Sequence, residues 1–323
     1  MTEKQIISDK IKAEALRLGF SACGIAPAEK VAEKTQSFFD RWLSNHYQAG
    51  MKYLENYSDQ RKDPRQLVKN ARSIICVALN YYPYQKLREE QYQFAWYAYG
   101  KDYHDIMKQK LAALYSYICK ELPFTEGRSF CDTAPIHERY WAWRAGLGWI
   151  GKNTQLIIPQ AGSCFFLGEL VIDTELAYDT PGKSRCGNCI RCLQNCPANA
   201  LEKPYTLNAN RCLSYLTIEN RGEIPVKSCS QMENRVYGCD ECQKVCPWNR
   251  FAVPTNVPEL QPSEKFLSMQ PEEWEKLTEE EYRKLFKGSA VKRAKYEGLM
   301  RNIRAVSSPQ QTPKTQDTDE GKF

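Results

Sequence analysis

Hydrophobic and polar positions in the first half of the chain predict helices and buried strands in turn. Residues 6–18 and 104–122 repeat apolar side chains at helical spacing, and each stretch is followed at once by a glycine or a proline. Residues 73–79 and 164–173 are short apolar runs, which predict buried strands. We therefore expect helices packed on a sheet.

The second half has a different pattern, because polar and cysteine-rich segments separate its helical stretches. Residues 138–144 predict a short helix before a glycine-punctuated loop, and residues 272–285 and 292–306 predict two further helices. These changes predict four parts: a sheet-and-helix domain at 1–178, a ferredoxin-like module at 179–250, a linker with basic helices at 251–306 and a disordered tail at 307–323.

Composition changes this picture little. The 323 residues are 42% hydrophobic and 26% charged, as in an ordinary globular protein. No run of about 18 apolar residues is present, and the polar N-terminus has no signal-peptide pattern, so we expect a cytoplasmic protein. We also expect a monomer, although the sequence carries no signal for the oligomeric state. Fourteen cysteines in a reducing compartment indicate metal ligands rather than disulfides.

Nine of these cysteines fall between residues 186 and 246, and most of them form two iron–sulfur motifs. The motifs are Cys186-x-x-Cys189-x-x-Cys192-x-x-x-Cys196-Pro197 and Cys239-x-x-Cys242-x-x-x-Cys246-Pro247. In the bacterial ferredoxin run, three thiolates hold one [4Fe-4S] cluster and the fourth reaches a second cluster. The sequence therefore predicts a relay that moves single electrons at low potential.

The last cysteine of each run binds the other cluster, and this cross-over rule divides the cysteines into two sets. One set is Cys186, Cys189, Cys192 and Cys246, and the other is Cys196, Cys239, Cys242 and one more. Cys212 is our choice for the eighth ligand, since it closes a short segment after Cys196, and Cys229 is the alternative. Zinc is the other metal that such pairs bind, but the triple spacing and both Cys-Pro endings favour iron–sulfur clusters.

The N-terminal part lacks the common nucleotide motifs but has a candidate acid. No Gly-x-Gly-x-x-Gly follows a strand, no P-loop is present, and Met107 stands where an Asp-x-His-x-x-Gly corrinoid signature needs glycine. Asp132 precedes a proline-initiated helix, so it is either a helix cap or a general acid whose pKa is raised in a partly apolar cleft. Tyr97, Tyr103 and His104 are candidates to line a large planar cofactor.

Several segments, taken in order, resemble the epoxyqueuosine reductase family. They are Gly100-Lys101-Asp102-Tyr103-His104, Asp132-Thr133-Ala134-Pro135 with Glu138-Arg139, residues 145–153, Phe166-Leu167-Gly168-Glu169, and the cysteine set with Tyr237-Gly238-Cys239-Asp240. The resemblance implies an α+β fold, in which a nitroreductase-like cobalamin-binding domain joins a ferredoxin-like module with two [4Fe-4S] clusters and a C-terminal helical segment. It implies reduction of epoxyqueuosine to queuosine at the wobble position of tRNA anticodons.

The resemblance also assigns roles to residues. Electrons would pass through the clusters to cobalamin, a ferredoxin or flavodoxin would supply them, and Asp132 would be the proton donor. The positions expected near cobalamin are Arg61, Tyr97, His104, Asp132, Leu156, Leu167 and Ser214. The basic residues expected to hold tRNA phosphates are Arg221, Lys227, Lys292, Arg293 and Arg301. From charge alone, a solvated helix face is the alternative for the C-terminal cations.

Two other classes of protein share part of this pattern. A cobalamin-dependent reductive dehalogenase-type enzyme has the same cofactors, but such enzymes commonly carry an export signal, which this N-terminus lacks. A ferredoxin-like electron carrier without substrate chemistry has no use for the segment around Asp132 or for the preceding domain. Turnover of an epoxyqueuosine-modified anticodon stem loop, measured with and without cobalamin, discriminates among the three.

Overall fold

A four-stranded antiparallel sheet organises the first half of the molecule in the computed structural model, which describes residues 1–307. The strand order is β1 (Ala22–Pro27), β2 (Ser73–Asn80), β7 (Phe165–Ile172) and β4 (Gly127–Phe130). β2 and β7 pair along their whole length at the centre of the sheet. These are the two strands that the apolar runs predicted.

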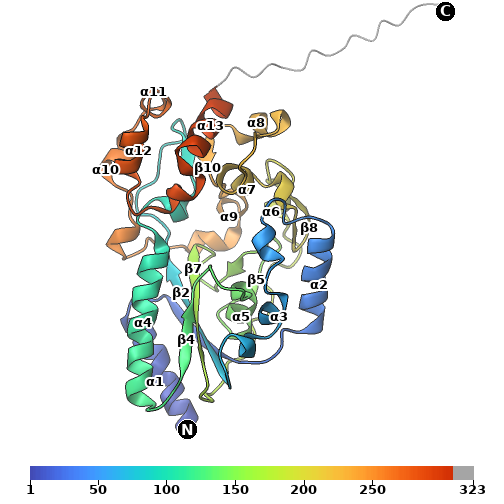
Figure 1. The fold of residues 1–323 in the computed structure, drawn as a ribbon, viewed down its shortest axis with the longest axis vertical. Coiled ribbons are helices and arrows are strands. Elements are labelled where there is room, and N and C mark those ends of the chain that lie inside the picture. Colours follow the sequence, from blue (N-terminus) through green and yellow to red (C-terminus); the bar gives the residue numbers. More distant parts are fainter. Residues whose placement is uncertain (308–323) are drawn as a thin grey trace, which may run out of the picture.

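Helices cover both faces of this sheet (Figure 1). α1 (Glu3–Arg17) and α4 (Tyr103–Glu121) lie on one face, and α5 (Glu138–Arg144) lies on the other. Side chains of a strand point to opposite faces in alternation, so Ile75 joins the core under α1 and α4 while Ile74 joins the core under α5. Both faces are buried, which explains why β2 and β7 are almost wholly apolar.

The C-terminal third of the described chain folds back on the first half. The short strand β3 (Gln93–Phe94) pairs in parallel with β10 (Arg235–Tyr237). The ring of Phe94 contacts the rings of Phe266, Trp274 and Phe286. One hydrophobic core therefore extends from the sheet domain to the C-terminal helices, which gather at the end of the molecule opposite the N-terminus in Figure 1.

The remaining elements are short and connect these parts. The helices are α2 (Glu33–Ser44), α3 (Ser58–Lys62), α6 (Arg191–Gln194), α7 (Leu213–Ile218), α8 (Val226–Met232), α9 (Glu241–Lys244), α10 (Glu264–Ser268), α11 (Pro271–Glu275), α12 (Glu279–Leu285) and α13 (Lys295–Ser307). The strands are β5 (Trp149–Ile150), β6 (Leu156–Ile157), β8 (Leu201–Lys203) and β9 (Thr206–Leu207). None of the helices described in residues 1–307 is long and apolar enough to cross a membrane.

The C-terminal helix predictions were wrong in detail. The expected helix at 272–285 is in fact two helices, α11 and α12. Thr278 is the N-cap of α12 and forms a capping box with Glu281, so the chain cannot continue as one helix through this position. The expected helix at 292–306 starts as a 3-10 turn at Ala290–Ala294, and α13 then runs to Ser307. The rest of the expected disordered tail, 308–323, lies outside the described residues.

The central strand β7 contains one acidic residue, Glu169, that is fully buried. It faces α5 between Leu167 and Val171, and neither of its carboxyl oxygens has a hydrogen-bond partner among the described residues. Burial, and then the negative charges of Glu138 and Asp132, raise its pKa well above the ordinary 4.5. The folded protein therefore keeps this proton at pH values where the unfolded chain has lost it.

Glu169→Met is expected to stabilise the protein by about 1–3 kcal/mol, because it removes a buried carboxyl group that has no partner. The folded pKa is raised, so the wild type loses stability as pH rises above 4.5 toward the folded pKa, and the gain of the variant should grow over that window. Denaturant unfolding at about pH 5 and about pH 8 checks this. Glu169→Gln, which removes only the ionisation, should show the same pH trend with a smaller gain, and an equal gain at both pH values would contradict the argument.

Candidate active site

A large cavity of about 990 Å³ lies where the sheet domain, the cysteine-rich module and the C-terminal segment meet. The sheet domain contributes the segment 51–61, residues 97 and 102–104 and the loop 132–135. The module contributes residues 207–219 from β9 to the end of α7, and the C-terminal segment contributes 289–293. The fold therefore builds this site from segments far apart in the sequence.

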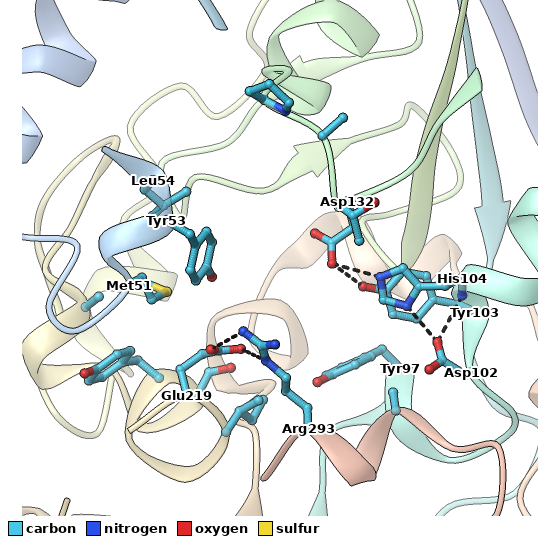
Figure 2. Close-up of a pocket in the computed structure, with 18 of the residues that line it drawn as sticks. Met51, Tyr53, Leu54, Tyr97, Asp102, Tyr103, His104, Asp132, Glu219 and Arg293 are labelled. Carbon is cyan, nitrogen blue, oxygen red and sulfur yellow. Dashed lines mark hydrogen bonds and ion pairs between the residues drawn. The ribbon is translucent and has the colours of Figure 1, made fainter. Parts of the chain in front are cut away.

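Asp132 lies on one wall of the cavity, in the loop after β4 (Figure 2). Its backbone is left-handed, with φ of 58°, and its amide donates to Glu138 Oε1 at 2.5 Å. Its carboxylate accepts from the Tyr103 hydroxyl at 2.8 Å and lies 3.2 Å from His104 Nε2. Asp132 is not a helix cap, since α5 starts after His137. With its side chain 55% exposed, a ligand in the cavity can reach it.

His104 links two aspartates at the start of α4. Its Nδ1 lies 2.7 Å from Asp102 Oδ1, and Asp102 also caps the helix by accepting from the His104 amide. The Asp102 and Asp132 carboxylates raise the pKa of His104 to about 10. At neutral pH the imidazole is therefore a cation between two carboxylates.

The expectation that the cleft raises the pKa of Asp132 was wrong. The hydrogen bond from His104 lowers that pKa, and this effect outweighs burial, which acts in the opposite direction. The proton that this wall can deliver is therefore stored on His104 and shared through the hydrogen bond with Asp132. Sequence reasoning placed the right residues in one cleft but had no means of knowing that an imidazole lies beside the carboxylate.

A reaction that takes this proton should slow at alkaline pH. Because the His104 pKa is raised, the site remains protonated until the pH rises through about 10 and loses its proton above that value. His104→Gln should lower the rate and remove this alkaline limb from the pH profile of a single turnover. His46→Gln, the same change at an exposed histidine, is the control and should keep both the rate and the limb. An unchanged limb in the His104 variant would show that another group supplies the proton.

The opposite wall carries Arg293, which is held by Glu219 in a two-point ion pair at 2.7 and 2.8 Å (Figure 2). The Glu219 carboxylate raises the pKa of this guanidinium further. Tyr53 lies nearby, and burial raises its pKa. Sequence reasoning found Arg293 but missed Glu219 and Tyr53. One feature of the sequence could have indicated Tyr53: it stands close to a second tyrosine, Tyr57, in an otherwise polar segment.

Arg61 and Tyr97 also line the cavity, as does Ser214 on α7. Arg61 is 8% exposed, and its Nε is buried with no hydrogen-bond partner among the described residues. An unpartnered buried guanidinium nitrogen needs an acceptor, such as a phosphate or amide oxygen of a bound group. Leu156 and Leu167, in contrast, do not line the cavity and pack in the core under α5.

The cysteines of the module group into the two sets that the cross-over rule gave. Cys186, Cys189, Cys192 and Cys246 line a small cavity of about 90 Å³. Burial and then the neighbouring thiols of this set raise the pKa of Cys192 to about 11. Burial raises the pKa of Cys242, and the next causes include the thiols of Cys239, Cys212 and Cys196. Cys212 therefore lies with the second set.

Cys229 lines neither the small cavity of the first set nor the large cavity. Its thiol is directed at backbone carbonyls of its own helix region, Ile224 and Pro225. Of the five cysteines outside the module that were expected to be buried, Cys76 and Cys164 are buried and Cys23, Cys119 and Cys131 are only partly buried. The second set adjoins the large cavity, because Cys212 is among the residues that line it.

The five basic residues expected at the nucleic acid have different surroundings. Lys292 and Arg293 line the large cavity. Arg301 is occupied by three backbone carbonyls and by Asn302, so it holds the fold together. Arg221 donates to two backbone carbonyls, one of them that of Arg293. Lys227 is exposed on α8 and does not line the cavity.

These features define a redox enzyme in which one of two thiolate sets adjoins a cofactor-sized cavity with a proton donor in its wall. Two family models match the chain: "Epoxyqueuosine reductase QueG, DUF1730" at residues 61–133 and "4Fe-4S double cluster binding domain" at residues 185–249. Epoxyqueuosine reductase of Cellulophaga algicola is 44% identical over 94% of this chain and 99% of its own length. That of Escherichia coli is 36% identical over 92% of this chain and 79% of its own. The chain belongs to the epoxyqueuosine reductase family.

Solved structures agree with this family. A crystal structure of epoxyqueuosine reductase with an epoxyqueuosine-modified stem loop of tRNA-Tyr has a TM-score of 0.86 and 28% identity, over 93% of this chain and 80% of that one. The Bacillus subtilis enzyme, with its aspartate-bearing catalytic loop swung out of the active site, has a TM-score of 0.86, 27% identity and coverage of 93% and 81%. The expected α+β fold, the oxidoreductase class and the cofactors, two [4Fe-4S] clusters and cobalamin, are confirmed.

Proposed function

We propose that this protein reduces epoxyqueuosine to queuosine at the wobble position of tRNA anticodons. The observation that carries the proposal is the position of the Asp132–His104 pair in a cavity that the second cysteine set adjoins. Removal of an epoxide oxygen as water needs two electrons and two protons. The cavity joins a route for the electrons to a source of protons, which a simple electron carrier does not need.

The residues present fit both cofactors. Cys186, Cys189, Cys192 and Cys246 would hold one cluster, and Cys196, Cys212, Cys239 and Cys242 the other. The large cavity accommodates a cofactor of the size of cobalamin, with Arg61, Tyr97 and Ser214 as its contacts and the unpartnered Arg61 Nε as a donor. Cobalamin, when bound, supplies the low-potential electrons that open the epoxide.

The side chains of the wall supply the proton. The proton stored on His104 would pass through Asp132 to the epoxide oxygen as the carbon–oxygen bond breaks. Tyr103, which donates to the same carboxylate, fixes its orientation. The left-handed backbone at Asp132 places this carboxylate on a loop rather than in the sheet, consistent with the mobile catalytic loop of the Bacillus subtilis enzyme.

The RNA would reach the cavity past the C-terminal segment. Lys292 and Arg293 are the exposed cations that line it, and single-stranded loops are the form of RNA in which a base can be splayed out for reaction. Arg221 and Arg301 would support this wall through the backbone rather than contact phosphates. We further propose that the protein acts as a monomer in the cytoplasm, where its tRNA substrate is made.

An anaerobic turnover assay tests the function. Reconstituted protein is mixed with an anticodon stem loop that carries epoxyqueuosine and with dithionite, with and without cobalamin, and the digested nucleosides are measured by mass spectrometry. Loss of one oxygen atom that depends on cobalamin is the expected result. No conversion by protein with full clusters and bound cobalamin would rule out the tRNA substrate.

A further inference from the structure

The two cysteine sets differ in their positions relative to the large cavity. Cys212, from the second set, lines that cavity, whereas the set with Cys186 lines a separate small cavity. Among the residues that the structure describes, the two cavities share no lining residue. The cluster held by Cys186, Cys189, Cys192 and Cys246 is therefore the distal one, and electrons from outside the protein have to enter there.

The chain around the distal set is exposed and free of acidic residues. From residue 180 to residue 201 the sequence contains no Asp or Glu. Lys183, Arg185 and Arg191 are exposed, and in the part of the chain that the structure describes they form no ion pair. Arg185 also lines the small cavity around the thiols. Three cations without an ion pair to a described residue thus lie on the segment that carries the ligands of the outer cluster.

Acidic side chains on the elements next to this segment are already neutralised. α9 packs against α6, and its Glu241 pairs with Arg235 at 3.1 Å and with Lys244 at 3.4 Å. β8 also contacts α6, and its Glu202 lies 3.7 Å from Arg211. The net charge of the surface is therefore positive, since its own cations form no ion pair with any residue in 1–307.

An exposed apolar residue lies in the same segment as these cations. Ile190, between the ligand Cys189 and Arg191, is 42% exposed. Gly187 has a φ of +47°, and a side chain at its position would meet nothing within 4 Å, so the ligand loop faces open space. Lys152 holds this loop in place by donating to the carbonyls of Gly187 and Cys189. A held loop that exposes an apolar side chain together with arginines is typical of a protein–protein interface.

We propose that this surface, the distal-cluster face formed by Lys183, Arg185, Ile190 and Arg191, docks a small acidic electron-transfer protein. At each encounter the partner is oxidised by one electron and the distal cluster is reduced by one electron, and two encounters supply one turnover. Opposite charges steer such encounters and raise the association rate by about 10–10³-fold. The inference rests on the cluster assignment, and it does not require that the RNA substrate is correct.

A stopped-flow experiment on the cluster-loaded protein tests this face. The variant combines Lys183→Glu, Arg185→Glu and Arg191→Glu, and the probe is a reduced flavodoxin with an acidic surface. The measured quantity is the rate at which the visible absorbance of the oxidised clusters bleaches. We expect the second-order rate constant to fall at least about 10-fold at low salt, with a smaller difference at high salt. Bleaching by dithionite should be unchanged, which shows that the clusters are intact.

The matched control reverses the same number of charges elsewhere. Lys34, Lys69 and Lys108 are exposed and form no ion pair with described residues, so their triple replacement by Glu changes the net charge equally. An equal loss of rate in this control would overturn the proposal, because net charge alone would explain it. Unchanged flavodoxin rates in the test variant, with weakened binding of the anticodon stem loop, would also overturn it and would assign the face to RNA. Neither outcome bears on the tRNA reaction, which dithionite-driven turnover tests separately.

Discussion

Asp132→Asn is expected to slow the reduction of epoxyqueuosine by about 10²–10⁴-fold, the usual contribution of a positioned general acid. Asparagine has nearly the same shape as aspartate and can still accept from the Tyr103 hydroxyl. It cannot carry the proton that His104 shares with this position, and it removes one of the two carboxylates that raise the His104 pKa. The chemical step should therefore fall while binding of the RNA stays close to that of the wild type.

Single-turnover rates with the modified stem loop measure this effect, together with iron and cobalamin content. Both contents should match the wild type, since Asp132 touches neither cysteine set. Asp105→Asn is the control, because it makes the same change one residue from His104 at an exposed position outside the cavity. A single-turnover rate in Asp132→Asn close to that of the control would show that the proton comes from another group.

Cys212→Ala is expected to abolish turnover and to remove about half of the iron and acid-labile sulfide, because a cubane normally needs all four thiolates. The structure places Cys212 at the wall of the large cavity, with the other thiols of its set behind it. Loss of this proximal cluster interrupts the route to the cavity, whereas the distal cluster has its own four ligands. The result that supports this assignment is a Cys212→Ala protein that keeps part of its iron but shows no turnover, even with dithionite as the reductant.

Cys229→Ala is the matched control for this variant. Cys229 is the other cysteine that the sequence allowed as the eighth ligand, and its thiol is directed at the carbonyls of Ile224 and Pro225. Full iron content and turnover are expected. If Cys229→Ala lost a cluster and Cys212→Ala kept both, the ligand assignment would have to be exchanged.

The sequence predicted the elements whose signals are local. The strands at 73–79 and 164–173 and the helix at 104–122 were found within one or two residues, because burial on both faces or on one stripe leaves a clear apolar pattern. The short strands β1, β3 and β10 were missed, since two to six residues carry too little periodicity. The break at Thr278 was missed for the opposite reason, because the helical pattern continues through it.

The pairing of Asp132 with His104 shows where sequence reasoning stops. Both residues were identified as candidates, but they are 28 positions apart and on different elements. The sign of the Asp132 pKa shift depends on whether a cation or only apolar atoms lie beside the carboxylate, and the sequence gives no distance between them. Arg301 illustrates the same limit, because its charge indicated phosphate binding while its contacts occupy it with backbone carbonyls.

By itself, the sequence determined that this protein holds two iron–sulfur clusters, because three ligands of a cluster lie within seven residues and a loop of that spacing can wrap it in any fold. The resemblance to the family also followed from the sequence, because it rests on short segments whose residues can be compared without knowing how they pack. Only the tertiary structure decided which cluster adjoins the cavity, that the proton is stored on His104, and that the cations near Cys186 form no ion pair within the described part of the chain. Each of these depends on distances between segments that the chain brings together only when it folds.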